Sequence, residues 1–223
     1  MVATMATIER YGISTASALA DITRRILGAS GLIALPTESF YGLAVDPFDE
    51  RALARLWKVK GRSEGKPILL LIGDKSQLGP LVRSIPPAAE ILMKAFWPGP
   101  LTIMFPAALG LSDAVTAGSN SVGIRYIAWP PLVDLLGRVG PVTGTSANRE
   151  GLPPPRTAEE VQNGLGDALD LIIDSGPTPG GRPSTVIDAQ GPIRIVREGA
   201  IERNAITAEL ALHGLHLESA NRQ

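Results

Sequence analysis

The stretch LIALPTES, residues 32–39, decides how this chain is expected to fold. Its apolar start is typical of a buried strand, and Pro36 ends that strand. The strand therefore opens into a loop, residues 36–39, which is well placed to carry function. Before it, residues 14–29 carry small and apolar side chains at helical spacing, with a serine as cap and Gly31 as a stop. The sequence thus predicts a helix followed by a buried strand.

Strands and helices keep alternating beyond this point. Asp49 can cap a helix that runs to residue 58, and Thr157 with Glu160 forms a capping box at the start of a later helix. The other expected elements are strands at residues 68–72, 101–105, 122–127, 141–143, 169–173, 185–188 and 193–196, and helices at residues 74–82, 87–96, 132–136 and around 207–213.

This interleaving predicts an α/β fold of mixed α+β type, in which one twisted, mixed β-sheet is flanked by helices. No internal repeat and no shift of composition marks a second domain. We expect an N-terminal segment over residues 1–13, a single domain over residues 14–205, and a C-terminal helix and tail over residues 206–223. The Pro/Gly-rich residues 175–183 have strand-like flanks, which favours a loop over a linker.

The composition excludes several classes of function. The 21 basic residues nearly balance the 22 acidic ones, so the net charge of −1 gives no drive toward nucleic acid and any anion site must be local. The absence of cysteine excludes disulfides and thiolate chemistry and favours a cytoplasmic setting. Two histidines near the end of the chain argue against a multi-histidine metal site, so no metal ligands are predicted. No membrane-spanning apolar run is present, and we expect no membrane insertion.

A basic cluster lies between the second helix and the strand at residue 68. The spacing of residues 61–66 resembles a P-loop but lacks one residue, and Pro67 stands where that motif needs a hydroxyl. The remaining cations fit either a solvated turn at a helix end or a local anion site. These cations are Lys58, Lys60, Arg62 and Lys66.

Two arginines stand in strand-like segments. Arg125 lies inside the apolar residues 122–127, and Arg197 ends the strand at residues 193–196. A buried arginine needs a partner, which is either an anion held in forked geometry or an internal carboxylate. The run TGTSAN, residues 143–148, could cradle a phosphate or a ribose, or could form an ordinary turn.

Taken in order, these segments resemble the YrdC domain family, the L-threonylcarbamoyladenylate synthases of tRNA modification. The resemblance covers residues 32 to about 200 and implies the fold of that family, with a concave cationic cleft. It rests on seven blocks: PTESFYGL (36–43), KGR (60–62) with KP (66–67), WPGPLT (97–102), VGIR (122–125), TSAN (145–148), STV (184–186) and REG (197–199).

The resemblance implies that L-threonine, bicarbonate and ATP are converted to threonylcarbamoyl-AMP and pyrophosphate, with Mg²⁺ expected alongside ATP. Partner proteins of tRNA modification would then use the product. The chemistry gathers negative charge in one place, so fixed cations and backbone donors should dominate catalysis.

The resemblance also implies roles for individual residues. Lys60 and Arg62 would be catalytic and hold bicarbonate or carbamate, so alanine at either position is expected to abolish turnover without unfolding what should be a loop. Ser39, Arg125 and Gly144 would bind threonine. The nucleotide contacts would be Arg62, Lys66, Ser121, Ser146, Asn148 and Arg197.

The sequence departs from the family at Leu71, where many members carry a histidine. Two other interpretations therefore stay open. One is a noncatalytic module that binds tRNA or double-stranded RNA through a basic concave surface. The other is a paralogue that adenylates a different small carboxylate in the same ATP cleft. The sequence leaves the oligomeric state, the partner proteins and closure of residues 175–183 over ATP undetermined.

Overall fold

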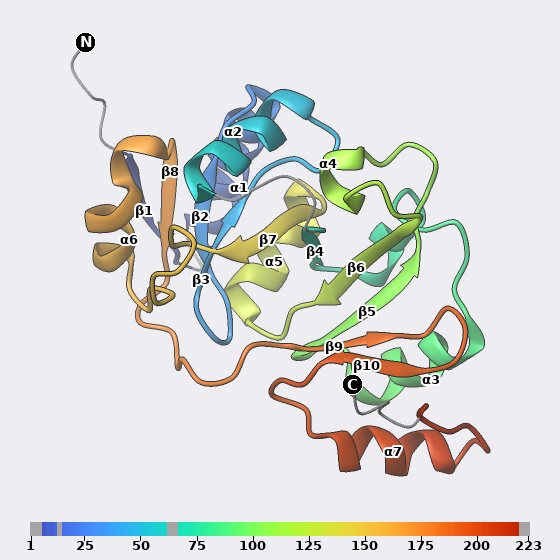
Figure 1. The fold of residues 1–223 in the computed structure, drawn as a ribbon. Helices are drawn as coiled ribbons and strands as arrows, with labels where there is room; N and C mark the ends of the chain where they lie inside the picture. Colours follow the sequence, from blue (N-terminus) through green and yellow to red (C-terminus); the bar gives the residue numbers. More distant parts are fainter. Residues whose placement is uncertain (1–5, 13–14, 62–66, 219–223) are drawn as a thin grey trace.

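A computed structural model describes residues 6–12, 15–61 and 67–218. Within them, ten strands form one sheet in the order β1-β8-β2-β3-β7-β4-β6-β5-β9-β10 (Figure 1). Parallel and antiparallel neighbours both occur, for example β4 with β6 and β4 with β7. The strands are β1 (Thr7–Arg10), β2 (Ile33–Pro36), β3 (Tyr41–Ala44), β4 (Leu69–Ile72), β5 (Leu101–Pro106), β6 (Ser121–Tyr126), β7 (Val142–Ser146), β8 (Leu171–Asp174), β9 (Thr185–Asp188) and β10 (Arg194–Arg197). The predicted mixed sheet with flanking helices is confirmed.

The helices begin where the sequence supplies caps. The Asp49 carboxylate accepts hydrogen bonds from the backbone of Arg51 and Ala52, and Thr157 and Glu160 form the predicted capping box. The helices are α1 (Ala16–Gly28), α2 (Glu50–Lys60), α3 (Pro87–Phe96), α4 (Asp113–Thr116), α5 (Pro130–Val139), α6 (Ala158–Leu165) and α7 (Arg203–Ala211), with 3₁₀ turns η2 (Lys75–Leu78) and η3 (Gly166–Ala168).

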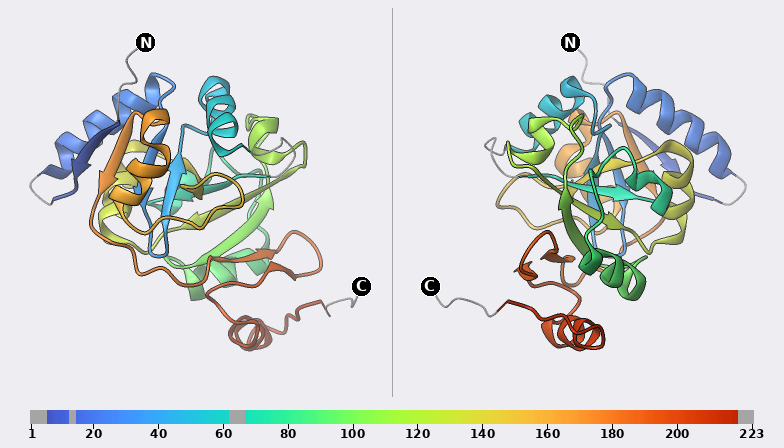
Figure 2. Two further views of the ribbon diagram at one scale, coloured as in Figure 1. Left: turned by 60° about the vertical axis from the view of Figure 1, so that its left-hand side comes forward. Right: turned by 90° about the vertical axis from the view of Figure 1, so that its right-hand side faces the viewer.

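Alternation along the strands sends side chains to two hydrophobic cores. Leu70, Ile72 and Ile124 join the larger core, to which α2, α3, α6 and α7 contribute buried side chains. Leu71 and Val142 join the smaller core under α1 and α5. Figure 2 shows β9, β10 and α7 together at one end of the molecule, away from α1. Because the smaller core ends near Leu71, the same face of the sheet beyond it is left for a pocket.

Several elements differ from the sequence-based expectations. The helix expected at residues 74–82 is only the turn η2, because Gly79 and Pro80 follow it. Strand β7 continues to Ser146, so much of the TGTSAN run is strand rather than turn. The last helix starts at Arg203 and not near 207. The serine expected to cap the first helix, Ser14, lies outside the described residues. The strands β1 and β3 and the short helix α4 were not predicted.

The C-terminal helix packs on the rest of the fold. Ile206 and Leu210 of α7 are fully buried in the larger core, against which α3 is also packed. Among the described residues, no helix combines the length and the apolar character needed to cross a membrane.

Candidate active site

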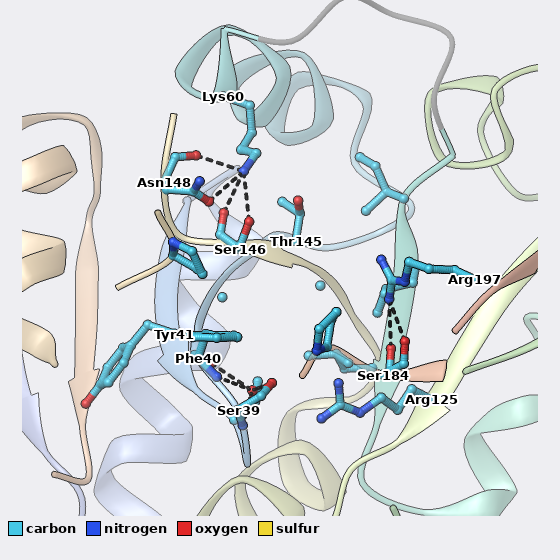
Figure 3. Close-up of a pocket in the computed structure, with 18 of the residues that line it drawn as sticks. Ser39, Phe40, Tyr41, Lys60, Arg125, Thr145, Ser146, Asn148, Ser184 and Arg197 are labelled. Atoms are coloured by element: carbon cyan, nitrogen blue, oxygen red, sulfur yellow. Dashed lines mark hydrogen bonds between the residues drawn. The ribbon is translucent and has the colours of Figure 1, made fainter. Parts of the chain in front are cut away.

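A pocket of about 580 Å³ lies over the face of the sheet that the smaller core leaves open (Figure 3). This volume suits a small-molecule site. It is bordered by the β2–β3 turn, the end of α2, strands β4, β6 and β7, the loop after β7, and the segment that leads into β9. Seven of the residues predicted for the site line it: Ser39, Lys60, Arg125, Gly144, Ser146, Asn148 and Arg197.

The β2–β3 turn is shaped by Thr37. Its hydroxyl donates to the carbonyl of Phe40 at 2.7 Å and accepts the backbone N–H of Ser39 at 3.2 Å. The carbonyl of Ser39 in turn accepts the N–H of Gly180 at 2.8 Å. The turn therefore holds Ser39 at the pocket and ties residues 176–183 to its rim.

Lys60 is a buried residue, only 5% exposed, at the last position of α2. The helix ends there because Gly61 adopts the left-handed conformation, with φ 61°. The Lys60 ammonium donates to the carbonyls of Ser146 and Asn148 at 2.7 and 2.8 Å, and lies 3.3 and 3.2 Å from their side-chain oxygens. The expectation that Lys60 lies in a loop outside the core is therefore wrong. Its first task is to hold the loop after β7 in place.

Gly144 forms part of the pocket floor. A Cβ atom at this position would lie 2.6 Å from Cγ of Leu71 and 3.0 Å from Cδ1 of Leu69. A side chain at position 144 would overlap these two leucines, so glycine is required for β7 to pack closely against β4 here. The pocket floor at this point is therefore apolar and closely packed.

Arg125 projects from β6 beside Leu71, its register partner on β4. Its side chain is 6% exposed and its Nη2 contacts Oε1 of Glu38, whose side chain is 17% exposed. Beyond this contact, Nε of Arg125 and Oε2 of Glu38 have no hydrogen-bond partner. The internal carboxylate that the sequence left open as a partner of Arg125 is therefore present.

Arg197 reaches the pocket because β10 contains a bulge. Arg194 pairs with Asp188 of β9, and Arg197 pairs with Val186, so four residues of β10 lie opposite three residues of β9. In a regular strand, residues 194 and 197 would face opposite sides; the extra residue at Val196 puts both arginines on one side.

The Arg197 guanidinium is fixed at Ser184. Its Nη2 donates to the carbonyl of Ser184 at 2.8 Å and lies 3.2 Å from its hydroxyl. Partial desolvation and then the positive charge of Arg125 lower the pKa of Arg197 from its ordinary value. Two mutually repelling guanidinium groups in one pocket favour an anion between them.

Some predicted residues are not brought to this pocket. Ser121 does not line it; its hydroxyl lies 2.9 Å from the side-chain amide nitrogen of Gln190. Arg62 and Lys66 lie outside the described residues. Sequence reasoning assigned no role to Glu38 or Ser184, although both stand in blocks that carried the family resemblance.

The segment before β9 is anchored along its length. The hydroxyl of Tyr41 donates to the carbonyl of Gly176 at 2.9 Å, and Nη2 of Arg156 donates to the carbonyl of Pro179 at 3.0 Å. Burial and then the Asp174 carboxylate raise the pKa of Tyr41, which therefore stays a neutral donor. Gly181, at the end of this anchored stretch, lines the pocket.

The donor set of the pocket suits anions better than a caged metal. Lys60, Arg125 and Arg197 line the pocket together with Glu150, and Glu38 contacts Arg125. In the described part of the chain no three His, Cys, Asp or Glu side chains are grouped as metal ligands. A divalent ion would therefore have to take most of its ligands from phosphate oxygens of a nucleotide and from water.

Comparisons with known proteins agree with this geometry. Residues 25–199 match the family model of Sua5/YciO/YrdC, whose description is "Telomere recombination". The threonylcarbamoyl-AMP synthase of Bacillus subtilis is 37% identical over 186 residues, which cover 82% of this chain and 54% of that protein. The synthase of the same name from Coxiella burnetii is 36% identical over 166 residues, covering 74% of this chain and 89% of that protein.

A solved structure shows the same fold. The crystal structure of P. abyssi Sua5 complexed with L-threonine superposes with a TM-score of 0.86 at 31% identity, covering 96% of this chain and 63% of that one. The match of most of the chain in both sequence and structure assigns this protein to the Sua5/YciO/YrdC family.

Proposed function

We propose that this protein is an L-threonylcarbamoyladenylate synthase, which forms threonylcarbamoyl-AMP and pyrophosphate from L-threonine, bicarbonate and ATP. The observation that carries the proposal is the convergence of Arg125, Arg197 and the Lys60-anchored loop on one pocket from distant parts of the sequence. Relatives named threonylcarbamoyl-AMP synthase, and a threonine complex of P. abyssi Sua5, support the same activity.

The pocket residues divide the work according to their charge and position. Arg125 offers a fork to the threonine carboxylate, with Ser39 and the backbone of Gly144 beside it. Ser146 and Asn148, whose positions Lys60 fixes, hold the AMP part of ATP. Arg197 takes the phosphate chain, and its charge offsets the negative charge that builds up as the carbamate attacks the α-phosphorus and pyrophosphate leaves. Arg62 and Lys66 are proposed to add cations to the nucleotide.

Mg²⁺ accompanies ATP in this proposal and supplies further charge to the phosphates. The product is consumed by partner proteins that modify tRNA. Direct binding of tRNA is not required for the chemistry, since all reacting groups are small molecules.

The test is a synthesis assay with the purified protein. ATP, bicarbonate and L-threonine together should give threonylcarbamoyl-AMP by mass spectrometry and an equal amount of pyrophosphate, and leaving out any one of them should stop both. Serine and alanine in place of threonine test whether another amino acid is the substrate. If no amino acid gives a carbamoyl adenylate, the proposed function is wrong.

A further inference from the structure

Thr102 carries a buried hydroxyl to which the proposed chemistry gives no role. The residue lies on β5, opposite Val186 of β9, and is only 1% exposed. Its hydroxyl is 2.9 Å from the hydroxyl of Ser184, a pocket residue that is 3% exposed. Within the described part of the chain, Ser184 is the one hydrogen-bond partner of this hydroxyl. Thr102 does not line the pocket, so an effect on a ligand must pass through Ser184.

Ser184 holds the Arg197 guanidinium with two oxygens (Figure 3). Its carbonyl accepts a hydrogen bond from Nη2 at 2.8 Å, and its hydroxyl oxygen lies 3.2 Å from the same nitrogen. A guanidinium group can only donate, so the hydroxyl oxygen must face Arg197 as an acceptor. The direction of the Ser184 side chain therefore decides whether the second contact exists.

The backbone on both sides of Ser184 is fixed by other contacts. The carbonyl of Pro183 accepts the N–H of Ala200 at 2.8 Å. The Thr185 hydroxyl donates to the carbonyl of Ile201 at 2.6 Å and accepts its N–H at 3.0 Å. The carbonyl of Ser184 is thus held by the backbone, whereas its hydroxyl depends on the β5 side chain that it contacts.

The methyl group of Thr102 fixes the direction of its hydroxyl. A Cβ atom at Gly123 of β6 would lie 3.3 Å from Cγ2 of Thr102, so the methyl group packs over this glycine. Because a β-branched side chain has few rotamers, the packing of the methyl group also sets where the hydroxyl points. The hydroxyl is therefore aimed at Ser184.

Resting on the proposed function, we propose that Thr102 is a positioning residue for Arg197. Its hydroxyl holds the Ser184 side chain in the orientation that gives the guanidinium a second oxygen. The Arg197 side chain is partly exposed, and an arginine held at one point only would adopt more rotamers. The second contact keeps the guanidinium directed into the pocket, so less conformational entropy is lost when it binds the phosphate chain of ATP.

The experiment measures ATP binding by calorimetry on the whole protein in the wild type, Thr102→Val, Arg197→Ala and the double variant. Valine has nearly the shape of threonine but lacks the hydroxyl. Thr102→Val should weaken ATP binding by about fivefold, and Arg197→Ala should weaken it by about tenfold. The double variant should bind ATP no more than about twofold more weakly than Arg197→Ala, because Thr102 acts only through that arginine.

Two results of this cycle would overturn the inference. Independent effects would multiply to a loss of about fiftyfold in the double variant, which is also what a purely structural role of Thr102 would give. Unchanged ATP binding in Thr102→Val would show that the hydroxyl does not support Arg197.

Two further variants separate the hydroxyl from the packing around it. Thr102→Ser keeps the hydroxyl and should bind ATP within about twofold of the wild type, although loss of the methyl group should lower the denaturant midpoint of unfolding. Thr23→Val makes the same change at a fully buried threonine whose hydroxyl has no hydrogen-bond partner, and should leave ATP binding unchanged. If Thr102→Ser weakens ATP binding as much as Thr102→Val does, packing and not the hydroxyl supports Arg197, and the inference is wrong.

The outcome also distinguishes this inference from the proposed function. A wild type that binds ATP and makes threonylcarbamoyl-AMP, yet shows independent effects in the cycle, contradicts only the role of Thr102. A wild type that binds no ATP contradicts the proposed function and this inference with it.

Discussion

Lys60 and Arg125 lie on opposite sides of one pocket and differ in how their charges are satisfied (Figure 3). The Lys60 ammonium is surrounded by four oxygens from Ser146 and Asn148. The Arg125 guanidinium has one contact, from Nη2 to Oε1 of Glu38, and its Nε has no hydrogen-bond partner. The difference indicates that Lys60 holds the loop after β7, whereas Arg125 pairs with a single carboxylate from the β2–β3 turn.

Replacing Lys60 is expected to have the largest effect. Lys60→Ala leaves the carbonyls of Ser146 and Asn148 without their charged donor, so the loop that we propose to hold the nucleotide loses its position. We expect kcat/KM to fall by at least about 100-fold and stability to fall by about 1–3 kcal/mol. Enzyme assays and denaturant unfolding measure the two effects.

The control is Lys58→Ala, which removes an exposed lysine from the same helix and should change neither quantity. If Lys60→Ala is as stable and as active as the wild type, Lys60 is not needed to position the loop after β7, and the contrast drawn here between Lys60 and Arg125 is wrong.

Replacing Arg125 with lysine is expected to act on one substrate only. Lysine keeps the charge but lacks the planar fork, so the KM for threonine should rise by about 10- to 100-fold. The KM for ATP in the same variant is the internal control and should stay within about twofold, since the loop after β7, which is proposed to bind the nucleotide, is untouched. Equal changes in both constants would show that Arg125 supports the whole pocket.

Arg197 gives a third, smaller effect. Arg197→Ala should raise the KM for ATP by about tenfold, whereas deletion of Val196 removes the bulge but leaves Arg197 opposite Val186 on the same side of the strand, so that KM should change by less than about threefold. Arg194→Ala removes an exposed arginine of the same strand and should leave that KM unchanged. If the deletion raises the KM for ATP as much as Arg197→Ala does, the register of β10 alone does not position Arg197.

Ser121 should give the smallest effect. Its hydroxyl is paired with Gln190 outside the pocket, so Ser121→Ala should change the KM for ATP by less than about twofold. A rise of tenfold in that KM would restore the nucleotide contact expected from the sequence and show that the pocket extends to the start of β6.

Elements that begin with a capping residue could be predicted from the sequence, whereas strands whose position depends on pairing with other strands were missed. Asp49 and Thr157 marked helix starts correctly, because their side chains cap the backbone locally. Strand β3 was missed because Gly42 interrupts its apolar pattern, and its place is set by pairing with β2 and β7.

The same distinction holds for the site. Arg125 and Arg197 were found because charged residues stand out in apolar strands. The burial of Lys60 was not predicted, since its partners lie 86 and 88 positions further along the chain. The bulge at Val196 could not be predicted from the sequence either, because it is defined by how β10 pairs with β9 and not by β10 alone.

The connection from β8 to β9 has a mechanical consequence. Six strands lie between these two in the sheet, so on a flat sheet their axes would be about 34 Å apart. The connection from Asp174 to Thr185 reaches at most about 40 Å when fully extended, and it is also tied to Ser39 and Arg156. Such a tether is only slightly longer than a flat sheet would require. Its length therefore limits how far the two ends of the sheet can move apart while β8 and β9 stay paired in it.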